Sequence, residues 1–396
     1  MLHNHYQQPG GEDQVFEVEG ALLEAHGHRV LRYTQHNDSV ADMTRAELAK
    51  ATVWNTVAYR ELRTLIREEQ PQVAHFHNTF PLISPAAYHA ARAERVPVVQ
   101  TLHNYRLICP SALFFREGRV CEDCSGKAVP WPGVAHACYR GSRSSSAAVA
   151  AMLTAHRVLG TWSRAVDAYI GLTEFARQRF VRGGLPAEKI VVKPNFVHPD
   201  PGAGGGDGEY VLFVGRLSEE KGVDTLLKAW KRPRVRVPLK IVGDGPLAPE
   251  VAEAAQRMGE VEWLGRQPRD NILALMKDAK ALVFPSVWYE GFPMVLAEAY
   301  AVGLPVIASD LGSMSSLVDH GRTGLRFRPG DPEDLATQVG WTSTHPAELQ
   351  RMRREARAEF EAKYTAERNY QLLMEIYRTV IERATVQAKA ADIPTN

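Results

Sequence analysis

Short apolar runs rich in β-branched residues alternate along the chain with longer stretches in which apolar residues recur every three or four positions. This alternation is typical of strand–helix–strand units, in which helices cover a parallel sheet. In the first half of the chain it predicts strands over residues 28–33, 73–77, 97–103, 168–172 and 190–193. It also predicts a helix that ends at residue 27 and helices over residues 55–69, 82–94 and 174–181.

The beginning of the chain is unusual for this pattern. A doubly wound domain normally opens with a buried strand, yet only residues 1–3 precede the polar stretch HYQQPGG. Either the first strand is very short or the given start lies downstream of the true one. We favour the second interpretation.

The alternation stops at residues 202–208 and then resumes. Their sequence, GAGGGDG, is typical of a flexible linker, so we place the domain boundary there. After it, the pattern predicts a helix over residues 222–230 and strands over residues 210–214, 239–242, 261–264, 281–285 and 305–308. The tail over residues 346–388 is almost wholly helical and rich in Glu, Arg and Ala. We therefore expect two doubly wound α/β domains, at residues 1–200 and 209–365, and a helical tail, at residues 366–396, that packs back on the first domain.

Composition and charge narrow the class of protein. Of 396 residues, 45% are hydrophobic and 23% charged, as in ordinary globular proteins. Lys and Arg number 47 against 46 Asp and Glu, a formal net charge of +1, so we expect no nucleic-acid partner, which would require a basic excess. No apolar run reaches the length of about 18 residues that a membrane helix needs, and the N-terminus lacks the pattern of a secretory signal. We expect a cytoplasmic protein.

The segment EGFPMVLAE, residues 290–298, follows a predicted strand and carries two carboxylates eight residues apart, Glu290 and Glu298. Gly291, Phe292 and Pro293 stand where a helix is expected to begin. The amides at a helix N-terminus bind anions, because they have no partner within the helix and the helix dipole adds positive potential. The alternative is a capped amphipathic helix that carries two exposed glutamates.

The segment VLFVGRLSEEKG, residues 211–222, is a predicted strand, a glycine turn and the start of a helix. Arg216 and Lys221 flank this loop and could hold a diphosphate, Arg by bidentate hydrogen bonds and Lys as a point charge. The pattern of a Walker loop, which ends in Gly-Lys-Ser/Thr, is missing. The alternative is a solvated basic turn.

Both segments lie at the carboxyl ends of predicted strands, where ligands bind in open α/β sheets, so we expect them to converge on one crevice. Together, GRLSEEKG and EGFPMVLAEA resemble the donor-binding half of retaining nucleotide-sugar glycosyltransferases of family 4, which have the two-domain GT-B fold. The resemblance extends over most of the chain. Its other segments are PGGED, HFHN, TLHNYR, GLTEFARQRF, KPNFV, IVGDGPL, VEWLGR and the stretch from ASDLGS to GDPEDLA.

The resemblance implies a role for individual residues. Arg216 and Lys221 would hold the donor diphosphate, Glu290 would contact hydroxyls of the transferred sugar, and Glu298 would accept hydrogen bonds from the ribose. Other residues are also implied to bind the donor. Gly10, Gly11 and Gly215 belong to them, and Gly10 and Gly11 would approach the phosphates. Gly265, Arg266 and Gln267 would lie against the base, and Gly291, Phe292, Pro293 and Met294 would lie beside the sugar and phosphate. His103, at the end of a predicted strand, would lie near the anomeric carbon. The alternative for His103 is a strand-end histidine whose partner is the backbone.

The mechanism that we expect is metal-independent and retaining. No Asp-x-Asp metal-binding pair stands in a suitable place, so cationic side chains and helix-terminal amides would stabilise the leaving diphosphate. The transition state would resemble an oxocarbenium ion, and the acceptor would attack from the face that the diphosphate leaves. The alternatives are a sugar-nucleotide epimerase of the same fold, whose carboxylate and histidine set we cannot place, and a non-catalytic scaffold. A phosphorylase would need a pyridoxal-bearing lysine, for which no motif is present.

The donor and acceptor are less defined by the sequence. UDP is the nucleotide that we favour, because it is the commonest in such donors. The acceptor expected from the resemblance is a carbohydrate or a glycolipid, with at most peripheral contact at the inner face of a membrane.

Four cysteines form an insert, at about residues 105–145 of the first domain, that departs from the family pattern. Their spacing is Cys109-x11-Cys121-x2-Cys124-x13-Cys138. Four thiolates can hold a tetrahedral zinc ion, and a metal would stabilise a loop that has little core of its own. We expect structural zinc, with His136 as a substitute ligand. Free thiols, a redox pair and an iron–sulfur cluster are the alternatives.

Overall fold

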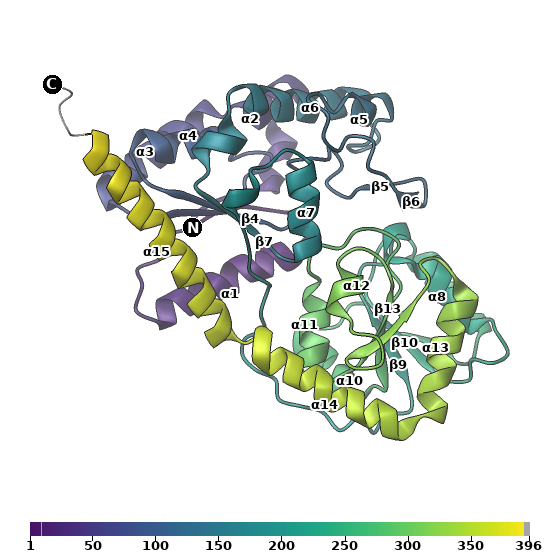
Figure 1. Cartoon of the computed structure of the whole chain (residues 1–396). Helices are drawn as coiled ribbons and strands as arrows, with labels where there is room; N and C mark the ends of the chain where they lie inside the picture. The colour runs from purple at the N-terminus through teal and green to yellow at the C-terminus, as the bar shows by residue number, and fades with distance from the viewer. Residues whose placement is uncertain (9, 392–396) are drawn as a thin grey trace. The chain divides into compact units, whose positions relative to one another are not determined.

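The computed structural model describes residues 1–8 and 10–391, and it divides the chain into two compact units. Unit 1 comprises residues 1–114, 122–194 and the tail from residue 369, and unit 2 comprises residues 115–121 and 195–368. Each unit is built on its own parallel sheet covered by helices (Figure 1). This confirms the predicted fold class, a pair of doubly wound α/β domains of the GT-B type.

The sheet of unit 1 has the strand order β2-β1-β3-β4-β7-β8, and every neighbouring pair is parallel. Its strands are β1 (Leu2–His5), β2 (Tyr33–His36), β3 (Ala74–Asn78), β4 (Val98–Leu102), β7 (Ala168–Gly171) and β8 (Ile190–Val192). The order reverses direction between β1 and β3. Such a switch point is where open α/β sheets bind ligands, at the carboxyl ends of the strands.

Helices cover both faces of this sheet (Figure 1). The helices of unit 1 are α1 (Gly11–Ala25), α2 (Arg45–Val53), α3 (Thr56–Glu69), α4 (Ala86–Ala93), α5 (Trp131–Ala135), α6 (Arg143–Val158), α7 (Glu174–Arg182) and α15 (Ala366–Ala391), with the shorter turns η1 (Asn37–Asp42), η2 (Thr161–Ala165) and η3 (Ala187–Lys189). α15 starts at the unit boundary and packs Leu373, Ile376 and Tyr377 into a core shared with Val99 and Ile170 of the sheet. The C-terminal tail is therefore part of the core of unit 1.

The sheet of unit 2 has the strand order β11-β10-β9-β12-β13-β14 and is also parallel throughout. Its strands are β9 (Val211–Val214), β10 (Leu239–Val242), β11 (Val261–Trp263), β12 (Ala281–Phe284), β13 (Val306–Ser309) and β14 (Gly324–Phe327), and a separate antiparallel hairpin is formed by β5 (Phe115–Arg116) and β6 (Arg119–Val120). The switch point of this sheet lies between β9 and β12.

The helices of unit 2 are α8 (Val223–Trp230), α9 (Ala248–Arg257), α10 (Arg269–Asp278), α11 (Met294–Ala301), α12 (Met314–Leu317), α13 (Pro332–Thr344) and α14 (Pro346–Lys363), with the turn η4 (Glu219–Lys221). Figure 1 shows α8 and α13 on one side of the sheet and α10 and α11 on the other. With both faces covered, β9 and β12 are completely apolar, VLFV and ALVF. The sequence therefore predicted β9 to β13, but it did not predict β14, whose sequence GLRF carries a charged residue.

Two predictions of the fold are wrong. Residues 28–32 form no strand, and β2 begins only at Tyr33. Residues 202–208 are not a flexible linker, because the amides of Gly204, Gly206 and Gly208 donate hydrogen bonds to carbonyls of Val302, Lys277 and Asp278. Glycine is used here for close packing, since a Cβ on Gly204 would lie 2.4 Å from the backbone of Lys277. The division between the units lies instead at residues 194–195.

The first strand of the sheet, β1, is short and buried. β1 pairs with both β2 and β3, and His3 and Asn4 are completely buried. Within the described residues, no helix combines the length and apolar character that crossing a bilayer requires.

Candidate functional site

The switch point of unit 2 brings together two of the residues singled out in the sequence. Lys221 ends the turn that follows β9, and Glu290 lies in the loop that follows β12. Lys221 Nζ lies 2.7 Å from Glu290 Oε1. The loops of neighbouring strands thus place a cation and a carboxylate where ligands bind in this fold.

The Glu290 carboxylate is buried and held by several donors. Besides Lys221, the hydroxyl of Ser286 donates to its Oε1 at 2.8 Å and the indole N–H of Trp288 at 2.7 Å. The Lys221 ammonium also lies 5.3 Å from the ring centroid of Trp288 and 5.6 Å from that of Phe284. A carboxylate fixed on one oxygen by three donors has little rotational freedom, which preorganises the site. The sequence analysis did not identify Ser286 or Trp288.

Close backbone packing explains why Lys221 reaches Glu290. Gly222 follows Lys221 with a φ of 72°, and a Cβ there would lie 1.9 Å from the Pro285 carbonyl oxygen. The amide of Val287 donates to the carbonyl of Glu220 at 2.9 Å. Only glycine fits this contact, so the β9 loop lies directly on the β12 loop.

The loops after β10 and β11 continue the same edge of the sheet. Gly243 donates from its amide to the carbonyl of Gly265 at 2.8 Å, and Gly215 donates to the carbonyl of Val242 at 3.0 Å. Arg266 pairs with Asp244 at 3.2 Å. Two further predicted residues lie at this edge. Arg216, in the loop after β9, is exposed, and the side-chain amide of Gln267, in the loop after β11, donates to the Leu264 carbonyl.

The start of α11 is fixed through Phe292. Phe292 is buried against Tyr364, and its carbonyl accepts a hydrogen bond from the Asn195 amide at 3.2 Å. The Phe292 side chain is therefore a core residue. Gly291, Pro293 and Met294 are half-buried, and α11 begins at Met294.

Glu298 lies within α11 and pairs with Arg269, whose Nε is 2.9 Å from Glu298 Oε1. The exposed fractions of Glu290 and Glu298 are 5% and 8%. The alternative of two exposed glutamates on an amphipathic helix is thus wrong. Because a carboxylate is buried only with partners, both glutamates belong to built polar sites.

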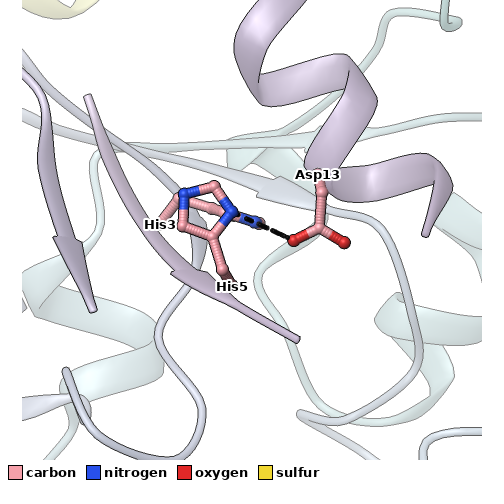
Figure 2. Close-up of side chains that lie close together, drawn as sticks. All are labelled: His3, His5 and Asp13. Carbon is pink, nitrogen blue, oxygen red and sulfur yellow. Dashed lines mark hydrogen bonds and ion pairs between the residues drawn. The ribbon is translucent and has the colours of Figure 1, made fainter. Parts of the chain in front are cut away.

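In unit 1, the predicted residues Gly10 and Gly11 lie at the N-terminus of α1. Asp13, in the first turn, accepts hydrogen bonds from the Gly10 amide at 2.7 Å and from His3 Nε2 at 2.9 Å, and His5 Nδ1 lies 3.3 Å away (Figure 2). Burial raises the pKa of Asp13, but these hydrogen bonds outweigh it and leave the pKa below its ordinary value. Asp13 therefore fixes the glycine loop to β1. The sequence analysis quoted this residue only within PGGED.

Glu12 is next to this loop, and burial raises its pKa to about 7, against hydrogen bonds from Tyr6 and Asn104 that lower it. A carboxyl whose folded pKa exceeds its ordinary value of 4.5 contributes stability that is lost as the pH rises through 7. We expect the melting temperature of wild type to fall relative to that of Glu12→Gln between about pH 5 and pH 8. The buried histidines change the melting temperatures of both proteins equally with pH, so their effect cancels in the difference between the two. If the melting temperatures of the two proteins changed in parallel over this pH range, the raised pKa of Glu12 would be contradicted.

His103 follows β4, and within residues 1–8 and 10–391 its ring has a side-chain partner and no backbone partner, so that alternative is wrong. Its Nε2 lies 3.0 Å from Nδ1 of His77, on β3, and the two rings stack with centroids 5.2 Å apart. Burial lowers the pKa of both imidazoles, so both are neutral near pH 7. His77, within HFHN, was not among the predicted site residues. Its place near the carboxyl end of a predicted buried strand is the signal that could have identified it.

The four cysteines divide between the units: Cys121 belongs to unit 2, whereas Cys109, Cys124 and Cys138 belong to unit 1. Cys109 and Cys124 are buried and the other two half-buried. Cys109 Sγ lies 3.2 Å from the Ser111 hydroxyl, and Cys124 Sγ lies 3.8 Å from the Pro130 carbonyl. The prediction that the insert lies wholly in the first domain is therefore wrong.

Both halves of the chain match models of glycosyltransferase families. Residues 10–201 match the model described as Glycosyltransferase Family 4, and residues 200–359 match the model described as Glycosyl transferases group 1. D-rhamnosyltransferase WbpZ of Pseudomonas aeruginosa is 35% identical over 161 residues, which cover 40% of this chain and 42% of that protein. Glycogen synthase of Mycobacterium tuberculosis is 35% identical over 153 residues, 37% of each chain. The chain thus spans less than half the length of these relatives.

Solved structures share the fold over nearly the whole chain. Anabaena HepE in complex with UDP is similar with a TM-score of 0.67 and 17% identity, over 96% of this chain and 99% of that one. Sucrose-phosphate synthase from Thermosynechococcus elongatus is similar with a TM-score of 0.69 and 18% identity, over 96% of each chain.

Proposed function

We propose that this chain, a GT-B protein with a Glycosyltransferase Family 4 domain followed by a Glycosyl transferases group 1 domain, transfers a sugar from a nucleotide-sugar donor to a hydroxyl acceptor with retention of configuration. The observation that carries the proposal is the Lys221–Glu290 pair at the β9–β12 switch point. A non-catalytic scaffold would not need a buried carboxylate paired with a half-buried ammonium at that position, since a buried charge is costly.

In this proposal, unit 2 binds the donor. Lys221 and Arg216 contact the diphosphate, and the Glu290 carboxylate accepts hydrogen bonds from hydroxyls of the sugar. Glu298 accepts hydrogen bonds from the ribose, and Arg269 holds it in place. The base lies against residues 265–267. Amides of Gly291, Phe292 and Met294 face the sugar and phosphate, whereas Pro293 has no N–H to donate.

The proposed reaction needs no catalytic metal. The bond between the anomeric carbon and the diphosphate oxygen breaks while the acceptor hydroxyl oxygen bonds to the same face of that carbon. The hydroxyl proton passes to the departing diphosphate. Lys221 stabilises the charge that grows on the diphosphate, an interaction stronger in the transition state than in the bound donor.

UDP is the favoured nucleotide, with support from the neighbour HepE, whose structures contain UDP and UDP-glucose. The acceptor is a carbohydrate or glycolipid, in line with relatives named for rhamnosyl transfer and glycogen synthesis.

A transfer assay with product analysis tests the function. The purified protein is incubated with UDP-sugars and a panel of sugar and glycolipid acceptors, and nucleotide release and the anomeric configuration of the product are followed by NMR. We expect acceptor-dependent release of UDP and a product with the anomeric configuration of the donor. Conversion of the donor alone into an isomer would support an epimerase instead, and an inverted product would overturn retention.

Removal of the Glu298 carboxylate should weaken donor binding. We expect Glu298→Ala to reduce the affinity for both the nucleotide and the nucleotide-sugar by about 1.5–3 kcal/mol, the size of hydrogen bonds to a charged group. Titration calorimetry measures both affinities. Glu253→Ala is the control, because it removes an exposed glutamate 2.7 Å from Arg257 in the same unit. Unchanged affinity in Glu298→Ala would refute the ribose assignment.

We also propose that cysteine thiolates of the insert hold structural zinc, with Cys109, Cys124 and Cys138 of unit 1 as the ligands. The purified protein should contain about one equivalent of zinc and show no iron–sulfur colour. Cys124→Ser should reduce the metal content and loosen residues 109–138 in hydrogen exchange, because the metal stabilises a segment with little core. Nucleotide binding should stay nearly unchanged, since Cys124 lies in unit 1, whereas Lys221, Glu290 and Glu298 lie in unit 2. Metal-free protein with four titratable thiols and normal stability would contradict zinc.

A further inference from the structure

A chain of buried polar side chains leads to His103 inside unit 1. The ammonium of Lys193, just after β8, lies 2.7 Å from Oε2 of Glu19 on α1. The other oxygen of Glu19, Oε1, lies 3.3 Å from Nε2 of His77, and Nδ1 of His77 lies 3.0 Å from Nε2 of His103. Lys193, Glu19 and His77 are each at most 2% exposed. Burying three polar groups in a row beside a half-buried fourth is costly unless each fixes the next.

The charges in this series of polar side chains balance while both histidines are neutral. Burial raises the pKa of Glu19, but the Lys193 ammonium together with the neighbouring His77 and His75 outweighs burial and leaves the pKa well below its ordinary value. Burial lowers the pKa of His77 and of His103, so both rings are neutral. One carboxylate and one ammonium therefore cancel, and the histidines carry one ring hydrogen each.

The positions of these hydrogens follow from the contacts. Apart from ion-pair contacts with Glu19, His77 Nε2 has no hydrogen-bond partner among the described residues. A bare ring nitrogen there would direct its lone pair at a buried carboxylate, so the hydrogen of His77 lies on Nε2. His77 Nδ1 is then an acceptor, and the hydrogen of His103 must lie on its Nε2.

A metal ion is a weaker explanation of the same cluster. Glu19, His75 and His77 place one ligand atom each within 4.8 Å of one another. However, Lys193 already neutralises Glu19, and both nitrogens of His75 have partners: Nδ1 lies 2.7 Å from the Tyr377 hydroxyl and Nε2 lies 2.8 Å from that of Thr101. A second cation there would face an ammonium.

We infer that Glu19 and His77 are positioning residues for His103, which they hold in the tautomer with hydrogen on Nε2, so that its Nδ1 accepts a hydrogen bond from a substrate hydroxyl. This inference rests on the proposed function for its last step, because a hydroxyl-rich donor or acceptor supplies the hydrogen. His103 itself is the partly exposed end of the chain of contacts. Glu19 and His77 act only through it.

The tautomer is measured directly by long-range 1H–15N correlation NMR on the full chain with 15N-labelled histidine, in which His103→Gln identifies the His103 signals. We expect His103 in wild type to be protonated on Nε2 alone. In Glu19→Gln, whose amide can donate to His77, we expect a second tautomer and a turnover lower by about 10- to 100-fold. Donor affinity should change by less than about twofold, because Glu19, as a positioning residue, contacts no donor atom.

Controls separate positioning from folding and from the proposed function. Glu24→Gln alters an exposed glutamate of the same helix that pairs with Arg32 and should leave tautomer and turnover unchanged. If Glu19→Gln unfolds because Lys193 loses its counter-charge, the double variant Glu19→Gln/Lys193→Met replaces it. A wild-type His103 protonated on Nδ1, or an unchanged tautomer in the folded variant, would overturn the inference. Absence of transfer with a confirmed Nε2 tautomer would refute the proposed function alone.

Discussion

Replacement of Lys221 by alanine should lower kcat by about 10²- to 10³-fold, the loss typical when one preorganised donor to a developing anion is removed. The effect should fall on kcat rather than on donor affinity, because the charge on the leaving diphosphate grows in the transition state. Steady-state kinetics and calorimetric titration of the nucleotide separate the two quantities. The result would identify Lys221 as a group that stabilises the leaving diphosphate.

The matched control is Lys228→Ala. Lys228 lies one helix further along, on α8, and pairs with Asp224 at 2.7 Å on the exposed surface. Loss of such an exposed pair should change stability by well under about 1 kcal/mol and leave kcat unchanged. If Lys221→Ala turned over donor at the wild-type rate, the switch point of unit 2 would not be the donor site.

Gly243→Ala should destabilise unit 2 by about 2–6 kcal/mol, the second large effect that we expect. Gly243 has a φ of 139°, and a Cβ there would lie 1.8 Å from the carbonyl oxygen of Gly215. Backbone strain and overpacking each cost about 1–3 kcal/mol, and here they add. Because Gly215 starts the β9 loop, the same change should also weaken nucleotide binding. Calorimetric melting with and without nucleotide measures both effects.

Two glycines in the same unit separate strain from packing. Gly265 has a φ of 63° with no atom near its would-be Cβ, and Gly259 has neither constraint. Gly265→Ala should cost about 1–2 kcal/mol from the left-handed conformation alone, and Gly259→Ala should be close to neutral. Equal melting temperatures for Gly243→Ala and Gly259→Ala would contradict the close packing of these loops.

The strands β9 to β13 of unit 2 and the loops that carry Lys221 and Glu290 could be predicted from the sequence because their signals are local. Apolar runs such as VLFV mark buried parallel strands, and Lys221 and Glu290 stand directly after two of them. Strand-end placement then sufficed to bring these two side chains together. The sheet order adds the reason, since β9 and β12 flank the switch point.

The polar interior of unit 1 could not be predicted, because its partners lie far apart in the sequence. Glu19 contacts Lys193 from 174 residues away, and His75 contacts Tyr377 from 302 residues away. Helical periodicity gives no indication that a glutamate on α1 is buried. The glycine-rich segment at residues 202–208 misled for a related reason: composition does not distinguish a solvated linker from backbone packed too closely for a side chain.

The central claim, a nucleotide-sugar site in unit 2, is tested most directly by calorimetric titration of the wild-type protein with UDP, GDP, ADP and TDP and their sugar conjugates. The account predicts saturable binding at one site for one of these nucleotides, with UDP favoured. The same nucleotide should raise the melting temperature as its concentration increases. Absence of binding and of any thermal shift for all four nucleotides and their sugar conjugates, at millimolar concentration, would contradict it.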